Sequence, residues 1–166
     1  MKRIKNVLIF FLAMVMLGAC PDKKSEKKEE ENIQQENTFV NPLKTEGAQC
    51  WANYYDGWYY YMQEAVDRLE LWRTRDITDL EHAEHKVIWI PKDPSNAHHL
   101  WGPEIHPIAG KWYVYYAASD DNMDNHQLFV LENSSADPFE GEFELKGRIS
   151  TDKNNNWAIH PTAVSY

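Results

Sequence analysis

The stretch Trp101–Ala118 constrains the fold more than any other part of the chain. Its second half alternates aromatic and β-branched residues, which is the composition of a half-buried strand. Ala109-Gly110 supplies a tight turn, and we expect Ile105–Ile108 to form the short strand before it. The stretch therefore predicts a β-hairpin that is preceded by a Trp-Gly-Pro-Glu segment.

The same layout occurs upstream in Ala52–Met62. Gly57 and Gly110 are about 53 residues apart, which is close to the repeat length of β-propeller blades. Two more apolar segments follow each hairpin, and each is expected to be a strand. They are Leu69–Arg73 and Lys86–Ile90 in the first unit, and Gln127–Leu131 and Glu142–Lys146 in the second. Four strands per unit is what a propeller blade requires, so the sequence predicts an all-β fold.

The N-terminal residues 1–19 have the features of an export signal. A basic end precedes an apolar run of about eleven residues from Val7 to Leu17, which suits a signal peptide and is short for a membrane span. The segment Leu-Gly-Ala-Cys that ends at Cys20 resembles the lipobox of bacterial lipoproteins. This resemblance implies cleavage before Cys20 and a lipid on that residue, whereas the alternative is an ordinary signal peptide with an unmodified cysteine.

A charged tether is expected to follow the lipid-bearing cysteine. Residues 20–37 are rich in Lys and Glu and have too few apolar residues to bury a core. Residues 38–166 then form the globular part. We therefore expect a lipid-anchored protein of the bacterial cell envelope, with the membrane as a partner through Cys20. The net charge of -9 argues against a nucleic-acid partner.

Cysteine usage fits an exported chain without a disulfide. The chain has two cysteines, and Cys20 is assigned to the lipid. Cys50 is therefore expected to be either a free thiol or a small buried apolar residue.

Six motifs follow the tether. They are Phe39–Leu43, Gly47–Trp51, Leu71–Leu80, Trp101–His106, Asp124–Asn133 and Trp157–Thr162. In this order and spacing, and with the aromatic hairpins between them, they resemble glycoside hydrolase family 43. The resemblance covers essentially everything after the tether. It implies a five-bladed β-propeller that cleaves arabinofuranosyl or xylosyl linkages in plant polysaccharides with inversion.

Such an enzyme needs carboxyl groups, because one carboxylate activates water while a carboxylic acid protonates the leaving oxygen. In the family the base stands in Ala-Asp-Pro-Trp, and the Asp that tunes the acid stands in Trp-Ala-Ile-Asp. The corresponding segments here read Ala-Gln-Cys-Trp and Trp-Ala-Ile-His, so Gln49 takes the base position and His160 the tuning position. The general acid, a Glu before Gly-Pro on the fourth blade, has no counterpart before Tyr166.

These substitutions predict a catalytically incomplete protein. An amide cannot accept a proton near neutral pH, and an imidazole does not hold a fixed negative charge beside an acid. We expect about two and a half blades, from a fragment of a longer protein or a chain completed by a partner. The alternative function is a non-catalytic, cell-surface glycan-binding lipoprotein, since the amide of Gln49 can hydrogen-bond a sugar hydroxyl.

The resemblance also suggests substrate-binding residues for an oligo- or polysaccharide. Trp51, Trp101 and His126 lie in motifs that approach the central sugar pocket, and His99 is close to Trp101 in sequence. Core packing is the alternative for the two tryptophans. Glu104 either contacts substrate or serves as a structural carboxylate that hydrogen-bonds its neighbours.

No cofactor or metal ligand is predicted. The chain has no Gly-rich phosphate loop and no Cys-x-x-Cys pair. His82 and His85 suit one face of a helical turn but have no evident third ligand, so a polar surface turn is expected. Asp120–Asn125 has neither the Gly nor the later Glu of a calcium loop, and we expect a solvated hairpin loop. A calcium ion at the propeller axis is left open.

Overall fold

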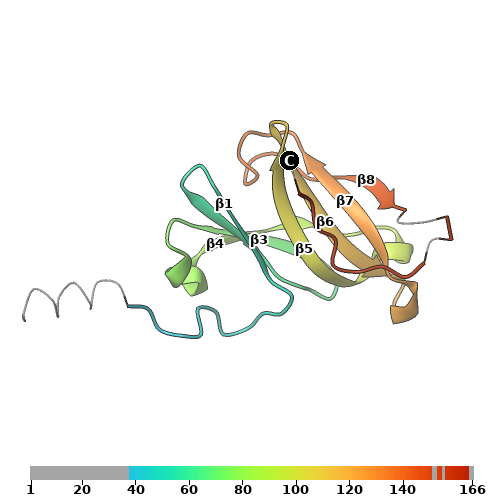
Figure 1. Ribbon diagram of the computed structural model, residues 1–166, viewed down its shortest axis with the longest axis horizontal. Coiled ribbons are helices and arrows are strands. Elements are labelled where there is room, and N and C mark those ends of the chain that lie inside the picture. Colours follow the sequence, from blue (N-terminus) through green and yellow to red (C-terminus); the bar gives the residue numbers. More distant parts are fainter. Residues whose placement is uncertain (1–37, 151–152, 155, 165–166) are drawn as a thin grey trace, which may run out of the picture. The chain divides into compact units, whose positions relative to one another are not determined.

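The computed structural model describes residues 38–150, 153, 154 and 156–164 (Figure 1). The chain divides into two compact units, residues 1–39 and 40–166, and the fold described below is that of the second unit. The predicted signal peptide, Cys20 and the rest of the tether lie outside the described residues. Within the described part, none of the helices has the length and apolar character needed to cross a bilayer.

The fold is all-β, as predicted, and consists of two four-stranded antiparallel meanders. The first sheet has the order β1 (Trp51–Tyr55), β2 (Trp58–Met62), β3 (Leu69–Thr74) and β4 (Glu84–Trp89). The second has the order β5 (His98–Ile108), β6 (Lys111–Ser119), β7 (Gln127–Asn133) and β8 (Glu144–Ile149). Three short 3₁₀ segments connect strands: η1 (Ile77–His82), η2 (Pro94–Asn96) and η3 (Met123–Asn125). Each sheet has the strand number and order of a propeller blade.

Both predicted hairpin turns are present. Asp56 and Gly57 have φ angles of 49° and 80°, and Ala109 and Gly110 have 50° and 77°. Two consecutive left-handed residues between paired strands form a type I′ turn, whose twist matches that of the flanking strands. The aromatic segments after these turns are β2 and β6, as expected.

The second hairpin differs from the prediction in its first strand. β5 begins at His98 rather than Ile105, so the Trp-Gly-Pro-Glu segment is part of the strand. The pairing of β5 with β6 shifts on both sides of Trp101, and Gly102 has a φ of 51°. These irregularities allow Pro103 to stand inside a strand, because a bulge removes the need for its missing amide donor. The last strand is also displaced, since β8 begins at Glu144 rather than residue 142.

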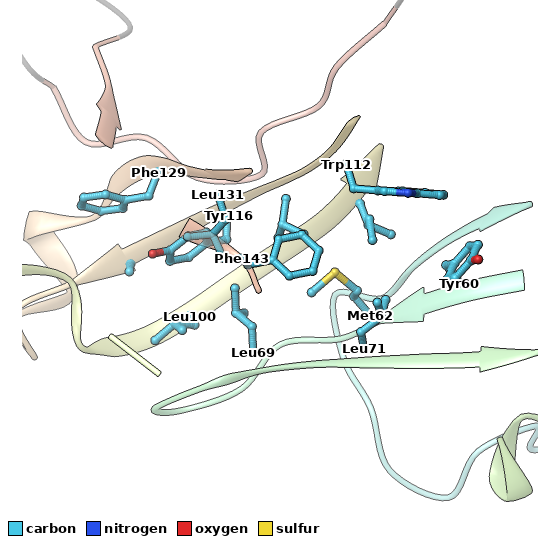
Figure 2. Close-up of a cluster of buried hydrophobic side chains, with 13 residues drawn as sticks. Tyr60, Met62, Leu69, Leu71, Leu100, Trp112, Tyr116, Phe129, Leu131 and Phe143 are labelled. Carbon is cyan, nitrogen blue, oxygen red and sulfur yellow. The ribbon is translucent and has the colours of Figure 1, made fainter. Parts of the chain in front are cut away.

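The core lies between the two sheets and follows the alternation of their strands (Figure 2). The first sheet contributes Met62, Leu69 and Leu71, all without exposed surface. The second contributes a larger set of buried side chains that includes Leu100, Ile105, Val114, Tyr116 and Leu131. Because neither sheet alone has a second layer to cover this face, packing the two sheets together is what buries it.

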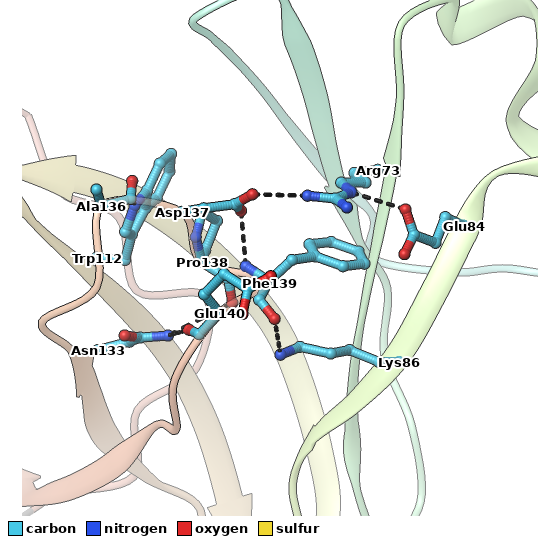
Figure 3. A network of polar contacts seen from close by, with 10 residues as sticks. All are labelled: Arg73, Glu84, Lys86, Trp112, Asn133, Ala136, Asp137, Pro138, Phe139 and Glu140. Atoms are coloured by element: carbon cyan, nitrogen blue, oxygen red, sulfur yellow. Dashed lines mark hydrogen bonds and ion pairs between the residues drawn. The ribbon is translucent and has the colours of Figure 1, made fainter.

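A polar contact joins the sheets at the rim of this core (Figure 3). Arg73 of β3 reaches Asp137, in the β7–β8 loop, at 2.7 Å and Glu84 of β4 at 2.9 Å. The guanidinium also lies 4.1 Å from the centre of the Phe139 ring, and Lys86 donates to the carbonyl oxygen of Phe139. The planar guanidinium thus satisfies a carboxylate on each sheet while it covers an aromatic ring.

Replacing Arg73 by alanine is expected to lower the free energy of unfolding by about 1–2 kcal/mol, because both ion pairs and the ring contact are lost. The measurement is the urea midpoint of the full chain. Arg68→Ala is the matched control, since Arg68 pairs only with nearby Asp67 and Glu70 and is exposed. Equal midpoints for the two variants would contradict a special role for the contact between the sheets.

Candidate functional site

The loop between β2 and β3 contacts both the segment before β1 and the first residues of β5. Glu64 donates its amide to the carbonyl oxygen of Ala48 at 3.0 Å, and Ala48 precedes Gln49. The next residue in the loop, Ala65, forms an isolated antiparallel bridge with Leu100 near the start of β5. Gln49 and the beginning of β5 therefore lie against the same loop.

A buried hydroxyl fixes the segment that leads to Gln49. Tyr61 donates its hydroxyl to Oε1 of Gln63 at 3.0 Å. A Cβ atom on Gly47 would lie 2.7 Å from that oxygen and 2.9 Å from the Tyr61 hydroxyl, so only glycine allows this approach. Burial raises the pKa of Tyr61 to about 12, so its hydroxyl keeps its proton at neutral pH.

The beginning of β5 also contacts the C-terminal segment. A Cβ atom on Gly102 would lie 2.9 Å from Nδ1 of His160 and 3.4 Å from its Cα. A side chain at position 102 would therefore force the His160 ring to shift, and the φ of 51° adds backbone strain for residues other than glycine. Because the β2–β3 loop touches β5 close to the same point, Gln49 and His160 are connected through the first residues of β5.

Three of the predicted site residues have left-handed backbone. Gln49, His99 and His160 have φ angles of 46°, 54° and 52°. This conformation is uncommon for residues other than glycine, and it concentrates at sites where the surrounding structure holds a side chain in a required direction. Gln49 and His160 are exposed and His99 is half-buried, so all three side chains are available to a ligand.

His126 is a buried support for this region. Its ring stacks on Trp101 at 4.1 Å and has no exposed surface. Nδ1 lies 2.8 Å from the carbonyl oxygen of Met123, and Nε2 lies 3.1 Å from that of His99. A neutral imidazole donates to one of these two oxygens at a time. In this position His126 orients Trp101 and His99 and has no surface for a sugar.

Trp51 is the first residue of β1, and Glu104 lies in the middle of β5. Trp51 is half-buried, donates Nε1 to the carbonyl oxygen of Ile105 at 3.2 Å and lies 5.0 Å from the ring of His106. Glu104 accepts from Nε2 of His106 at 3.0 Å, and both side chains are largely buried. This contact favours the structural role for Glu104. Sequence reasoning missed His106, although its partner Glu104 is two residues away and therefore on the same face of β5.

The described residues contain no group of three or more His, Cys, Asp or Glu side chains that could hold a metal ion. His82 pairs with Asp79 at 2.6 Å, whereas His85 lies in β4 and stacks on Trp72. The expected polar surface turn is present at His82, where η1 ends, whereas His85 lies in the exposed part of β4, so the two histidines do not share a helical face. Cys50 is an exposed free thiol, which is the first of its two expected states.

The Asp120–Asn125 loop is built by its own side chains. Asp120 accepts from the side-chain amide of Asn125 at 3.0 and 3.1 Å and from the backbone amide of Asn122. The Asn125 bond is the main reason why the pKa of Asp120 is lowered. The loop is exposed and stabilised by internal hydrogen bonds, as expected for a solvated hairpin loop.

The two aromatic-rich, four-stranded antiparallel meanders each have the strand order found in propeller blades. The α-L-arabinofuranosidase of Lactobacillus brevis has a similar structure, with a TM-score of 0.70 and 28% identity over 76% of this chain and 43% of that one. The family described as glycosyl hydrolases family 43 matches residues 22–166. The chain therefore belongs to glycosyl hydrolase family 43.

Relatives in sequence agree with this membership. The extracellular exo-α-(1→5)-L-arabinofuranosidase of Streptomyces chartreusis is 40% identical over 118 residues, which is 68% of this chain and 36% of the relative. The enzyme of the same description from Streptomyces avermitilis is 38% identical over 120 residues, or 69% of this chain and 25% of the relative. The chain thus spans about a third or less of the length of these relatives.

Replacing Gly102 by alanine is expected to displace the segment that carries His160, because the new methyl group would clash with it. Faster hydrogen exchange in residues 156–164 measures this displacement. Gly110→Ala is the matched control, since Gly110 also has positive φ but a methyl group there would meet no atom within 4 Å. Both variants carry a backbone cost of about 1 kcal/mol, and only Gly102→Ala should open the segment. Identical exchange in the two variants would contradict the close contact.

Proposed function

We propose that this chain belongs to a protein directed at arabinose- or xylose-containing polysaccharide, and that as written it does not hydrolyse O-glycosyl bonds. The observation that carries the proposal is the exposed amide of Gln49 at the position of the family's catalytic base. A carboxylate there would take a proton from water, whereas an amide only exchanges hydrogen bonds.

His160 supports the same conclusion. Its ring packs on Gly102 at the position where the family has an Asp that tunes the acid. An imidazole is neutral or positive, so it cannot raise the proton affinity of a neighbouring carboxyl as a carboxylate does. Loss of general base catalysis alone lowers the rate of hydrolysis about 10²- to 10⁴-fold, and an acid whose pKa is not adjusted lowers that rate further.

The second candidate function is non-catalytic glycan binding at the cell surface. It is favoured by the accessibility of Gln49, His99 and His160, whose amide and imidazole groups can exchange hydrogen bonds with a ligand. The His99 ring also lies 5.9 Å from that of Trp101. Neutral amides and imidazoles suit sugar hydroxyls, and no cofactor enters this proposal.

Export to the cell envelope is part of the proposal. Two relatives are described as extracellular enzymes, and the N-terminal sequence has the order of a lipoprotein signal. We place the lipid on Cys20. Incorporation of a radiolabelled fatty acid that is lost in Cys20→Ser, but kept in Cys50→Ser, would support this anchor; incorporation in both variants would contradict it.

The catalytic part of the proposal is tested with aryl α-L-arabinofuranosides and aryl β-D-xylosides. We expect no release of aglycone above the enzyme-free rate, because the base position cannot accept a proton. The complete Streptomyces chartreusis relative serves as the positive control. Turnover within tenfold of that enzyme would overturn the proposal. Calorimetric titration of linear arabino-oligosaccharides then separates the two candidates, since saturable binding without cleavage supports the glycan-binding role.

A further inference from the structure

A polar cavity of about 580 Å³ lies at one end of the second sheet. Its walls come from η2, from the β6–β7 loop, from the outer strands β7 and β8, and from Trp157. Among its lining residues, none is a predicted substrate-binding or catalytic residue. The cavity therefore has a different set of lining residues from the candidate site.

Trp157 gives the cavity a fixed aromatic wall. Its indole nitrogen donates to the carbonyl oxygen of Met123 at 2.8 Å, and its ring meets His126 edge-on at 6.4 Å. About half of the side chain, 51%, is nevertheless exposed. An indole that is held in place while one face is open presents its negative π surface to a ligand, and the C–H bonds of a sugar ring suit that surface.

Two polar side chains on the cavity wall have acceptor oxygens without a hydrogen-bond partner among the described residues. The carboxylate of Asp124 makes no hydrogen bond or ion pair with the described residues, because only its backbone amide is bonded, to Asn122. Asn96 is 2% exposed, and its Oδ1 has no hydrogen-bond partner in the described part of the chain. An unpaired buried amide oxygen is unfavourable, and a hydroxyl donor that reached it after a rotation of the Asn96 side chain would satisfy it.

The other carboxylates of the cavity argue against a cation as its ligand. Asp93 accepts from the backbone amide of Ser95 at 2.9 Å, and Asp120 is occupied by Asn125 and Asn122. Arg148 adds a positive charge to the same wall. Since the described residues also lack a cluster suited to a metal, a neutral ligand rich in hydroxyl groups fits best.

We propose that this cavity is a second glycan-binding site, which takes a short neutral oligosaccharide. Trp157 stacks on one sugar ring, and Asp124 and Asn96 accept hydrogen bonds from its hydroxyl groups. The choice of arabinose-containing sugar rests on the proposed function. Two sites on one protein increase its residence on a polymer, because the second contact forms at high effective concentration.

The test is a titration of the ¹⁵N-labelled full chain with linear α-1,5-linked arabinotriose, followed through the tryptophan indole N–H signals. Trp157→Phe assigns the signal of the cavity, and Trp51→Phe assigns a signal of the candidate site. We expect the Trp157 signal to shift saturably. Asp124→Ala should weaken that response about tenfold, through loss of a charged acceptor, while the Trp51 response stays unchanged.

Asp56→Asn is the matched control, because it removes an exposed carboxylate in the β1–β2 turn, and asparagine tolerates the positive φ found there. It should leave both responses unchanged. A shift of Trp51 alone, or a Trp157 shift that Asp124→Ala leaves intact, overturns the second site but not the proposed function. A shift of Trp157 alone supports the second site and counts against sugar binding at the candidate site. Absence of any shift overturns the second site and the glycan-binding candidate, and leaves the proposed lack of hydrolysis to the aryl glycoside assay.

Discussion

Face-to-face packing of the two sheets determines where every other group in this structure lies. Side chains alternate along a strand, so burying Val114 and Tyr116 against the first sheet directs Tyr113 and Tyr115 to the opposite face. A register slip of one residue would exchange these faces and place aromatic hydroxyls in the apolar core. The register is fixed at one end by the Ala109-Gly110 turn and at the rim by Arg73, whose charge is satisfied from both sheets.

β5 departs from this regular alternation on both sides of Trp101, and the departure shapes the candidate site. Its register shifts around Trp101 and Gly102 leave short irregular backbone, against which the β2–β3 loop and His160 both pack. A regular strand with a side chain at position 102 would keep His160 away. The irregularity therefore brings residues from three distant segments together, as bulges near functional sites commonly do.

The sequence predicted those parts of the fold whose signals lie within a few neighbouring residues. The hairpins were predictable because a period of two and an Ala-Gly or Asp-Gly turn lie within ten residues. The start of β5 could not be predicted, because Gly102 and Pro103 normally end a strand and the bulge that compensates for them depends on the pairing with β6. Gln49 and His160 came from family resemblance alone, because neither residue type indicates left-handed backbone. Asn96 had no local signal, because its surroundings are formed by segments distant in sequence, whereas the pairing of His106 with Glu104 follows the period of two of β5.

The carboxyl groups show what kind of chemistry the described residues support. Those whose pKa departs from its ordinary value are all shifted downward, because each accepts hydrogen bonds. They are Asp76, Glu81, Asp93, Asp120 and Glu132. A carboxyl held in this way is deprotonated at neutral pH and cannot protonate a leaving oxygen, whereas a general acid needs surroundings that raise its pKa. Sugar binding has no such requirement, because hydroxyl groups are recognised equally well by amides, imidazoles and ionised carboxylates. Recognition of a glycan and proton transfer to or from it therefore depend on different electrostatic conditions, so a structure of this kind could retain the first without the second.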